Sequence, residues 1–147
     1  CHWSELNRGE YMSDAEGVIT GVGGIFFKCR DREKLVSWYQ DKLGFPFDGA
    51  GASFVFREDD DPEKLGYFVW GPFKRESEYF RPSGKEFMIN LRVRGIEKLV
   101  ERLKKMGVEQ IGEIEEFEYG KFAWIMDPEG TKIELWEQLG EPPIMDE

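Results

Sequence analysis

The chain has 147 residues and carries 30 Asp and Glu against 20 Lys and Arg, a formal net charge of −10, which argues against nucleic acid as the main partner because phosphate binding needs a basic surface. The single histidine, His2, excludes most zinc, non-haem iron and copper sites and every histidine-dependent catalytic triad. Two cysteines cannot build a disulfide framework, which favours a reducing, cytoplasmic setting, and the longest uncharged stretch, Gly17 to Phe27, is too short to span a membrane.

The two ends of the chain differ from its centre. Residues 1–17 are polar and aperiodic, and Met12 resembles a natural start, so we interpret this segment as a leader or an expression remnant. A single domain is expected over 18–140, and residues 139–147, with their Pro-Pro pair, are expected to form a C-terminal tail. Within the domain we expect a first module at 18–73, a linker at 74–84 and a second module at 85–138.

An internal repeat defines these modules. The sequence Glu-Lys-Leu-Val at 33–36 recurs 64 residues later at 97–100. The preceding stretches, 24–30 and 88–94, align at the same offset, and both alternate in hydrophobicity as strands do.

The helices and strands follow the same order in each module. A helix is expected from Asp31, a good N-cap, to Leu43, and a second over 96–106; each ends at a glycine followed by an apolar residue. Strands are expected at 45–49, 53–57 and 66–70, and again at 113–117, 121–126 and 131–137. The sequence therefore predicts an α+β protein built from two tandem βαβββ modules.

The last two strands carry the most specific signal. The run Asp-Pro-Glu-Gly-x-x-Ile-Glu-Leu at 127–135, together with Trp38-Tyr39 and Leu43-Gly44-Phe45 in the first module, resembles the vicinal oxygen chelate superfamily, the glyoxalase/bleomycin-resistance/dioxygenase group. The resemblance covers about 19–137 and implies that the modules form one curved mixed sheet, a bowl that holds the site. It also implies a homodimer, which edge strands and apolar patches independently favour.

The resemblance also implies four metal-ligand positions, two in each module. Carried over, they fall on Gly24 and Met88 in the first strands and on Trp70 and Glu134 in the last strands. Only Glu134 can bind a metal, and one carboxylate does not hold a divalent ion against water. We therefore expect no metal and no cofactor, which removes the metal-dependent chemistries of the superfamily.

Strand alternation predicts which side chains line the bowl. Glu134 is the expected central carboxylate and candidate catalytic group, with Trp70 facing it across the bowl from the other module. The remaining candidate ligand-binding residues are Phe26, Lys28, Met88, Asn90, Arg92, Trp124 and Trp136, with Lys132 beside them on the last strand. Such an aromatic cavity with one acid suits a small aromatic or cationic molecule.

Two classes of function remain open. The first is a metal-free binding protein, similar to the bleomycin-resistance branch, that needs only a cavity and a counter-charge. The second is a metal-free lyase or isomerase with Glu134 as general base and Lys28 or Arg92 stabilising an oxyanion. A third interpretation is a dimeric protein without a small-molecule role, whose aromatic strand residues only pack and whose Glu134 only forms an ion pair.

Overall fold

The computed structural model describes residues 16–48, 51–59 and 61–142, and its core is one mixed sheet of seven strands in the order β2-β3-β1-β4-β7-β6-β5. The leader predicted at 1–17 lies almost wholly outside the described residues, as does most of the predicted tail. In chain order the elements are β1 (Val18–Cys29), α2 (Arg32–Leu43), β2 (Ala52–Arg57), β3 (Leu65–Lys74), β4 (Phe87–Arg94), α3 (Ile96–Lys105), β5 (Glu115–Phe117), β6 (Gly120–Met126) and β7 (Lys132–Gln138).

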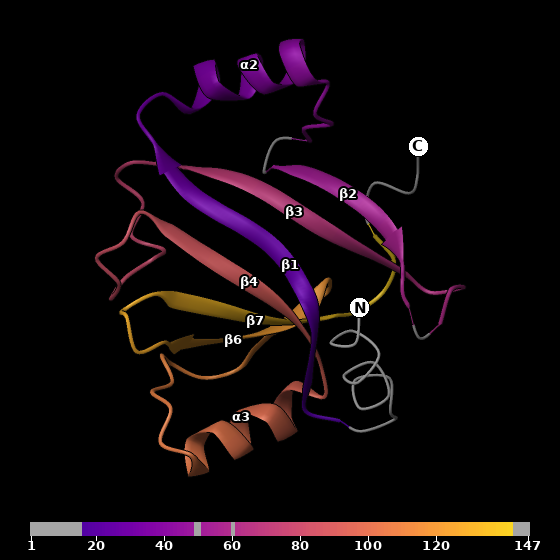
Figure 1. Cartoon of the computed structure of the whole chain (residues 1–147), viewed down its shortest axis with the longest axis vertical. Coiled ribbons are helices and arrows are strands. Elements are labelled where there is room, and N and C mark those ends of the chain that lie inside the picture. The colour runs from indigo at the N-terminus through magenta and orange to yellow at the C-terminus, as the bar shows by residue number, and fades with distance from the viewer. Residues whose placement is uncertain (1–15, 49–50, 60, 143–147) are drawn as a thin grey trace, which may run out of the picture.

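The sequence repeat appears in the sheet as an approximate twofold relation. β1 and β4 pair antiparallel at the centre, where Ile25 lies opposite Ile89, its own counterpart in the repeat. β1 then pairs in parallel with β3, as β4 does with β7, and the sheet stays open because β2 and β5 are its edges. Figure 1 shows α2 and α3 at opposite ends of this sheet. The predicted α+β class and tandem modules are confirmed.

The two helices begin in different ways. Asp31 caps α2, since its carboxylate accepts a hydrogen bond from the Lys34 N–H at 3.1 Å, and Gly44 ends the helix in the left-handed conformation, both as predicted. α3 begins after Gly95, which has no side chain to cap it. The Glu137 carboxylate of β7 does so instead, accepting from the N–H groups of Gly95 and Ile96 at 3.0 Å each. Neither helix in the described part of the chain is long and apolar enough to cross a membrane.

One predicted strand is nearly absent from the first module. The segment 45–49 was expected to pair along its length, but among the described residues it makes only one bridge, between Phe47 and Ala52. Phe45 and Phe47 pack against Trp70 instead, with ring centroids 5.2 and 5.8 Å away. Their side chains therefore fill the space below α2. The other predicted strands form with end shifts of one or two residues, except that β1 begins at Val18 rather than at 24 and β3 continues to Lys74.

The hydrophobic core is concentrated in the second module. One cluster lies under α3 and comprises Val93, Ile96, Leu99, Val100, Ala123 and Leu135. A second cluster occupies the other face of the sheet and comprises Tyr67, Phe80, Met88, Phe122, Trp124 and Trp136. α2, in contrast, has no buried residue. The second cluster includes Trp124 and Trp136 of the predicted bowl, with Phe26 packed against it.

The Glu137 contact predicts a stability effect. Replacing Glu137 by Ala leaves two N–H groups at the start of α3 without their carboxylate partner, so we expect a loss of about 1–2 kcal/mol in the free energy of unfolding. Urea denaturation of the variant measures this loss. Glu129→Ala, at an exposed turn position, is the matched control. Equal stability of both variants would contradict the assigned cap.

Candidate functional site

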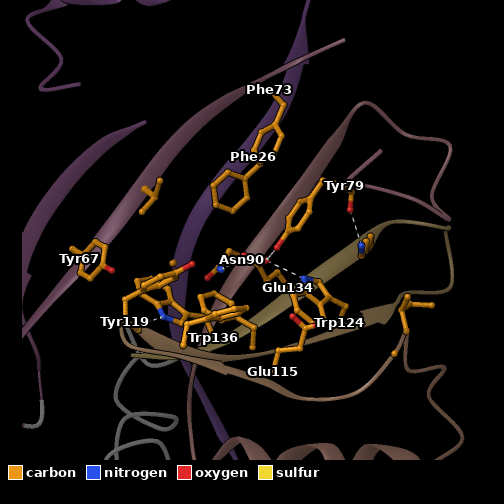
Figure 2. A pocket seen from close by; sticks show the side chains of 17 residues that line it. Phe26, Tyr67, Phe73, Tyr79, Asn90, Glu115, Tyr119, Trp124, Glu134 and Trp136 are labelled. Carbon is orange, nitrogen blue, oxygen red and sulfur yellow. Dashed lines mark hydrogen bonds between the residues drawn. The ribbon is translucent and has the colours of Figure 1, made fainter. Parts of the chain in front are cut away.

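A cavity of about 580 Å³ opens on the aromatic face of the sheet, and we call it the bowl pocket. Its polar lining comes from Asn90, Glu115, Lys132 and Glu134, with Gly23 and Gly112 at its wall. The remaining lining is apolar or aromatic and comprises Phe26, Tyr67, Val69, Phe73, Tyr79, Ile111, Phe117, Tyr119, Phe122, Trp124 and Trp136. Figure 2 shows these side chains converging from both modules. The pocket therefore has the composition of a small-molecule site.

Glu134, on β7, is buried at one end of this pocket, with 4% of its surface exposed. Its Oε1 accepts a hydrogen bond from Asn90 Nδ2 at 2.7 Å. Its Oε2 accepts from Trp124 Nε1 at 2.9 Å and from the Tyr79 hydroxyl. All three contacts use the carboxyl group as an acceptor, which is the role of the ionised form. Figure 2 draws dashed lines to this group from Tyr79 and Trp124.

Tyr79 reaches Glu134 from the connection between β3 and β4, outside the sheet. Its ring stacks on Phe73, with centroids 5.7 Å apart and planes 13° apart. Burial, followed by the charge of Glu134 and the hydrogen bond to it, raises the pKa of the Tyr79 hydroxyl above its usual value of 10.0. The hydroxyl therefore stays protonated and donates to the carboxylate.

Lys132 lies behind Tyr79. Its ammonium group donates to the Tyr79 carbonyl oxygen at 2.7 Å and lies 5.1 Å from the centre of the Tyr79 ring. Burial lowers the pKa of Lys132, and the negative charge of Glu134 partly opposes this effect. Lys132 thus holds the main chain that carries Tyr79.

Three aromatic rings on β6 and β7 form a row along the pocket. The ring of Phe122 lies nearly parallel to those of Trp136 and Trp124, with interplanar angles of 3° and 15° and centroids 6.1 and 6.3 Å away. Tyr67 meets Trp136 edge-on at 4.9 Å. Parallel faces beside a buried carboxylate suit a planar ring that carries positive charge.

Residues 24–136 match the family described as glyoxalase-like domain, which spans most of the chain. The chain belongs to this family. Comparison with curated proteins found no significant match. The match runs from Gly24 in β1 to Trp136 in β7 and therefore covers both modules.

Solved structures agree with this assignment. Methylmalonyl-CoA epimerase from Mycobacterium tuberculosis is 16% identical with a TM-score of 0.56, over 89% of this chain and 96% of the epimerase. A Streptomyces coelicolor methylmalonyl-CoA epimerase variant in complex with 2-nitronate-propionyl-CoA is 14% identical with a TM-score of 0.63, over 84% and 100%. A glyoxalase/bleomycin resistance protein/dioxygenase superfamily member from Vibrio splendidus 12B01 is 17% identical with a TM-score of 0.52, over 80% and 97%. At these identities the likeness establishes a shared fold only.

The glyoxalase-like pocket brings together five of the nine predicted site residues: Phe26, Asn90, Trp124, Glu134 and Trp136. Three of the others lie next to it without lining it. Met88 is fully buried in the core cluster below it. Arg92 lies behind Trp136, 5.1 Å from its ring, and is paired with Glu58. Lys28 lies over the ring of Phe80 at 5.7 Å and borders an outer groove near α2.

Trp70 does not face Glu134, and this expectation is corrected. It packs on the opposite side of the sheet, 4.1 Å from the ring of Tyr39 on α2 and 4.9 Å from that of Phe27. The cause is the strand register. Asn90 pairs with Glu134, whereas its counterpart Phe26 pairs with Gly71, so the repeat offset is 63 residues in the last strands and 64 in the first strands and the helices. A slip of one residue moves a strand side chain to the other face.

The positions at which the superfamily places metal ligands do not fit a divalent ion in this glyoxalase-like protein. The four carried-over positions hold Gly24, Met88, Trp70 and Glu134, of which only Glu134 is charged. Both of its oxygens already accept hydrogen bonds, and Asn90 presents its NH₂ group to the carboxylate. Among the described residues, no three His, Cys, Asp or Glu side chains are grouped so that they could hold a metal ion. A divalent ion needs lone pairs where this site supplies N–H and O–H donors.

Sequence reasoning missed Tyr79 as a site residue. It lies in the segment interpreted as a linker, and its contact with Glu134 spans 55 residues. The available signal was the pair Tyr79-Phe80, two large aromatic residues inside an otherwise polar connection. Phe80 is in fact 1% exposed and anchors this connection in the core.

The raised pKa of Tyr79 predicts a pH dependence of stability. The unfolded tyrosine loses its proton near pH 10.0 while the folded one keeps it, so the stabilisation is complete below that pH and is lost as pH rises above it. Above pH 10, wild type should lose unfolding free energy faster than Tyr79→Phe. The extra slope should stay below about 1.4 kcal/mol per pH unit, because Tyr79 is 39% exposed and partly screened by solvent. Urea denaturation from pH 9 to 11 tests this, and identical slopes would contradict it.

Proposed function

We propose that this glyoxalase-like protein binds a small planar aromatic cation in the bowl pocket without a metal ion. The observation that carries the proposal is the environment of Glu134: a buried carboxylate met by neutral donors, beside a row of aromatic rings. No Lys or Arg nitrogen of the described residues forms an ion pair with it within 4.0 Å. A ligand cation would supply the missing positive charge.

The surrounding polar atoms support a ligand that donates hydrogen bonds. Asn90 Oδ1 is buried and has no hydrogen-bond partner among the described residues, so acceptors exceed donors at this end of the pocket. Glu115 adds a second carboxylate at the pocket wall, against one ammonium group from Lys132. The net charge of −10 favours the approach of cations over a longer range.

The alternative is a metal-free lyase or isomerase with Glu134 as general base. Burial of Glu134 favours it, but both of its oxygens are engaged by donors, which a substrate C–H group would have to displace. The cations expected to stabilise an oxyanion, Lys28 and Arg92, lie outside the pocket lining, and Arg92 is already paired with Glu58. The geometry therefore supports binding better than catalysis. In favour of the alternative, the neighbours in fold include a methylmalonyl-CoA epimerase solved with 2-nitronate-propionyl-CoA.

A charge-matched pair of probes tests the proposal. Tryptamine and 3-propylindole share their ring and shape, but only tryptamine carries an ammonium group. Glu134→Gln should weaken tryptamine binding by about tenfold or more, because it removes the charge opposite the ammonium, and should leave 3-propylindole binding unchanged. Isothermal titration calorimetry measures both affinities, with Glu129→Gln as control.

Two results would contradict this function. One is an equal effect of Glu134→Gln on both probes. The other is ligand binding that requires added divalent metal, which a thermal-shift screen of aromatic cations and keto acids with and without metals would reveal. Stabilisation by keto acids alone would favour the lyase or isomerase.

We further propose that the protein acts as a twofold homodimer in the cytoplasm. Support comes from exposed apolar side chains on β1 and α2, where Val22, Ile25, Trp38 and Leu43 are 42–54% exposed, and from the open edges β2 and β5. Analytical ultracentrifugation at micromolar concentration should give twice the chain mass of 17.2 kDa. A species at the single-chain mass would contradict the dimer, and Trp38→Glu should dissociate it.

A further inference from the structure

Tyr79 differs from the other two donors to Glu134 in how it is held. Asn90 and Trp124 lie on β4 and β6 and are 2% and 9% exposed. Tyr79 lies in the connection before β4 and is 39% exposed. In Figure 2 it extends toward the carboxylate from outside the strands that carry Asn90, Trp124 and Glu134. The sheet fixes two donors, whereas the third is a side chain that rotation can remove.

The main chain around Tyr79 is nevertheless anchored. Ser83 Oγ donates to the Gly130 carbonyl oxygen at 2.6 Å, and Lys85 Nζ donates to Thr131 Oγ1 at 2.9 Å, so the connection is fastened to the turn between β6 and β7. Lys132 adds the third tie, to the Tyr79 carbonyl oxygen. The side chain is thus presented to Glu134 from an anchored main chain.

The Tyr79 hydroxyl occupies the place on the carboxylate that a ligand donor would use. Oε2 already accepts from Trp124, so the hydroxyl completes its two acceptor positions. A neutral ring can lie in the pocket while this bond remains. A ligand ammonium can replace the hydroxyl, because a hydrogen bond between two charged groups is stronger than one from a neutral phenol. A quaternary ammonium has no N–H and would leave the carboxylate oxygen unsatisfied.

We propose that Tyr79 determines the specificity of the bowl pocket, because its hydroxyl competes with ligands for Glu134. The pocket then selects arylalkyl ammonium ions that carry N–H donors over neutral rings and quaternary cations. This inference rests on the proposed function and names the ligand class. Tyr79 is a competitor for the site rather than a contact that holds the ligand. Its removal should therefore strengthen the binding of amines.

The test uses three indole probes with wild type, Tyr79→Phe and Tyr39→Phe in calorimetric titrations at neutral pH. Tyr79→Phe keeps the ring that stacks on Phe73 and removes only the hydroxyl. Tryptamine should bind this variant about tenfold more tightly than it binds wild type, whereas 3-propylindole affinity should not change. Tyr39→Phe, in the aromatic group under α2, removes a hydroxyl outside the pocket and should change neither affinity.

The third probe needs no variant. N,N,N-trimethyltryptammonium carries the same charge as protonated tryptamine and keeps the indole N–H but has no ammonium N–H donors, and wild type should bind it about tenfold more weakly. Equal affinities for these two cations overturn the inference, as does a Tyr79→Phe variant that binds tryptamine less tightly or shifts all probes equally. If wild type and the variant bind none of the probes, both the inference and the proposed function fail. If the probes bind but their affinities do not follow the expected order, the inference fails and the proposed function stands.

Discussion

The Glu134 carboxylate is the group around which the pocket is organised, because a buried negative charge is tolerated only where donors surround it. Its three donors come from β4, β6 and the connection between β3 and β4. They meet only if β4 and β7 pair in the observed register and the connection crosses to the β6–β7 turn. One electrostatic requirement, that donors surround the buried carboxylate, thus depends on the strand order, the anchoring of the connection and the pocket shape.

The two modules have taken different roles around this group. The second carries most of the well-buried core under α3 and supplies the carboxylate and the aromatic row. The first contributes Phe26, Tyr67 and Phe73 as walls, while its helix α2 buries no residue and rests on an aromatic group centred on Trp70. The two repeated units therefore differ: one packs its helix on a buried core, and the other has apolar side chains exposed on its helix and first strand.

The sequence predicted those features that local patterns encode. The repeat, the cap at Asp31 and the strands of the second module all follow from spacing and hydrophobic alternation. The segment 45–49 does not form the predicted strand, because its alternating aromatic residues pack on Trp70 instead. Alternation alone does not distinguish these two arrangements. Trp70 was predicted on the wrong face of the sheet, because a one-residue change of the repeat offset does not alter the local sequence pattern. Tyr79 was missed because its partner lies 55 residues away.

Phe26 and Gly71 stand where the approximate twofold axis would otherwise repeat Asn90 and Glu134. A Cβ atom on Gly71 would lie 2.7 Å from a ring carbon of Phe26, so only glycine leaves room for that ring. The symmetric scaffold consequently encloses an unsymmetric space, with a phenyl group from the β1–β3 pair and a carboxylate from the matching β4–β7 pair. An elongated guest with one charged end therefore meets different walls in its two possible orientations.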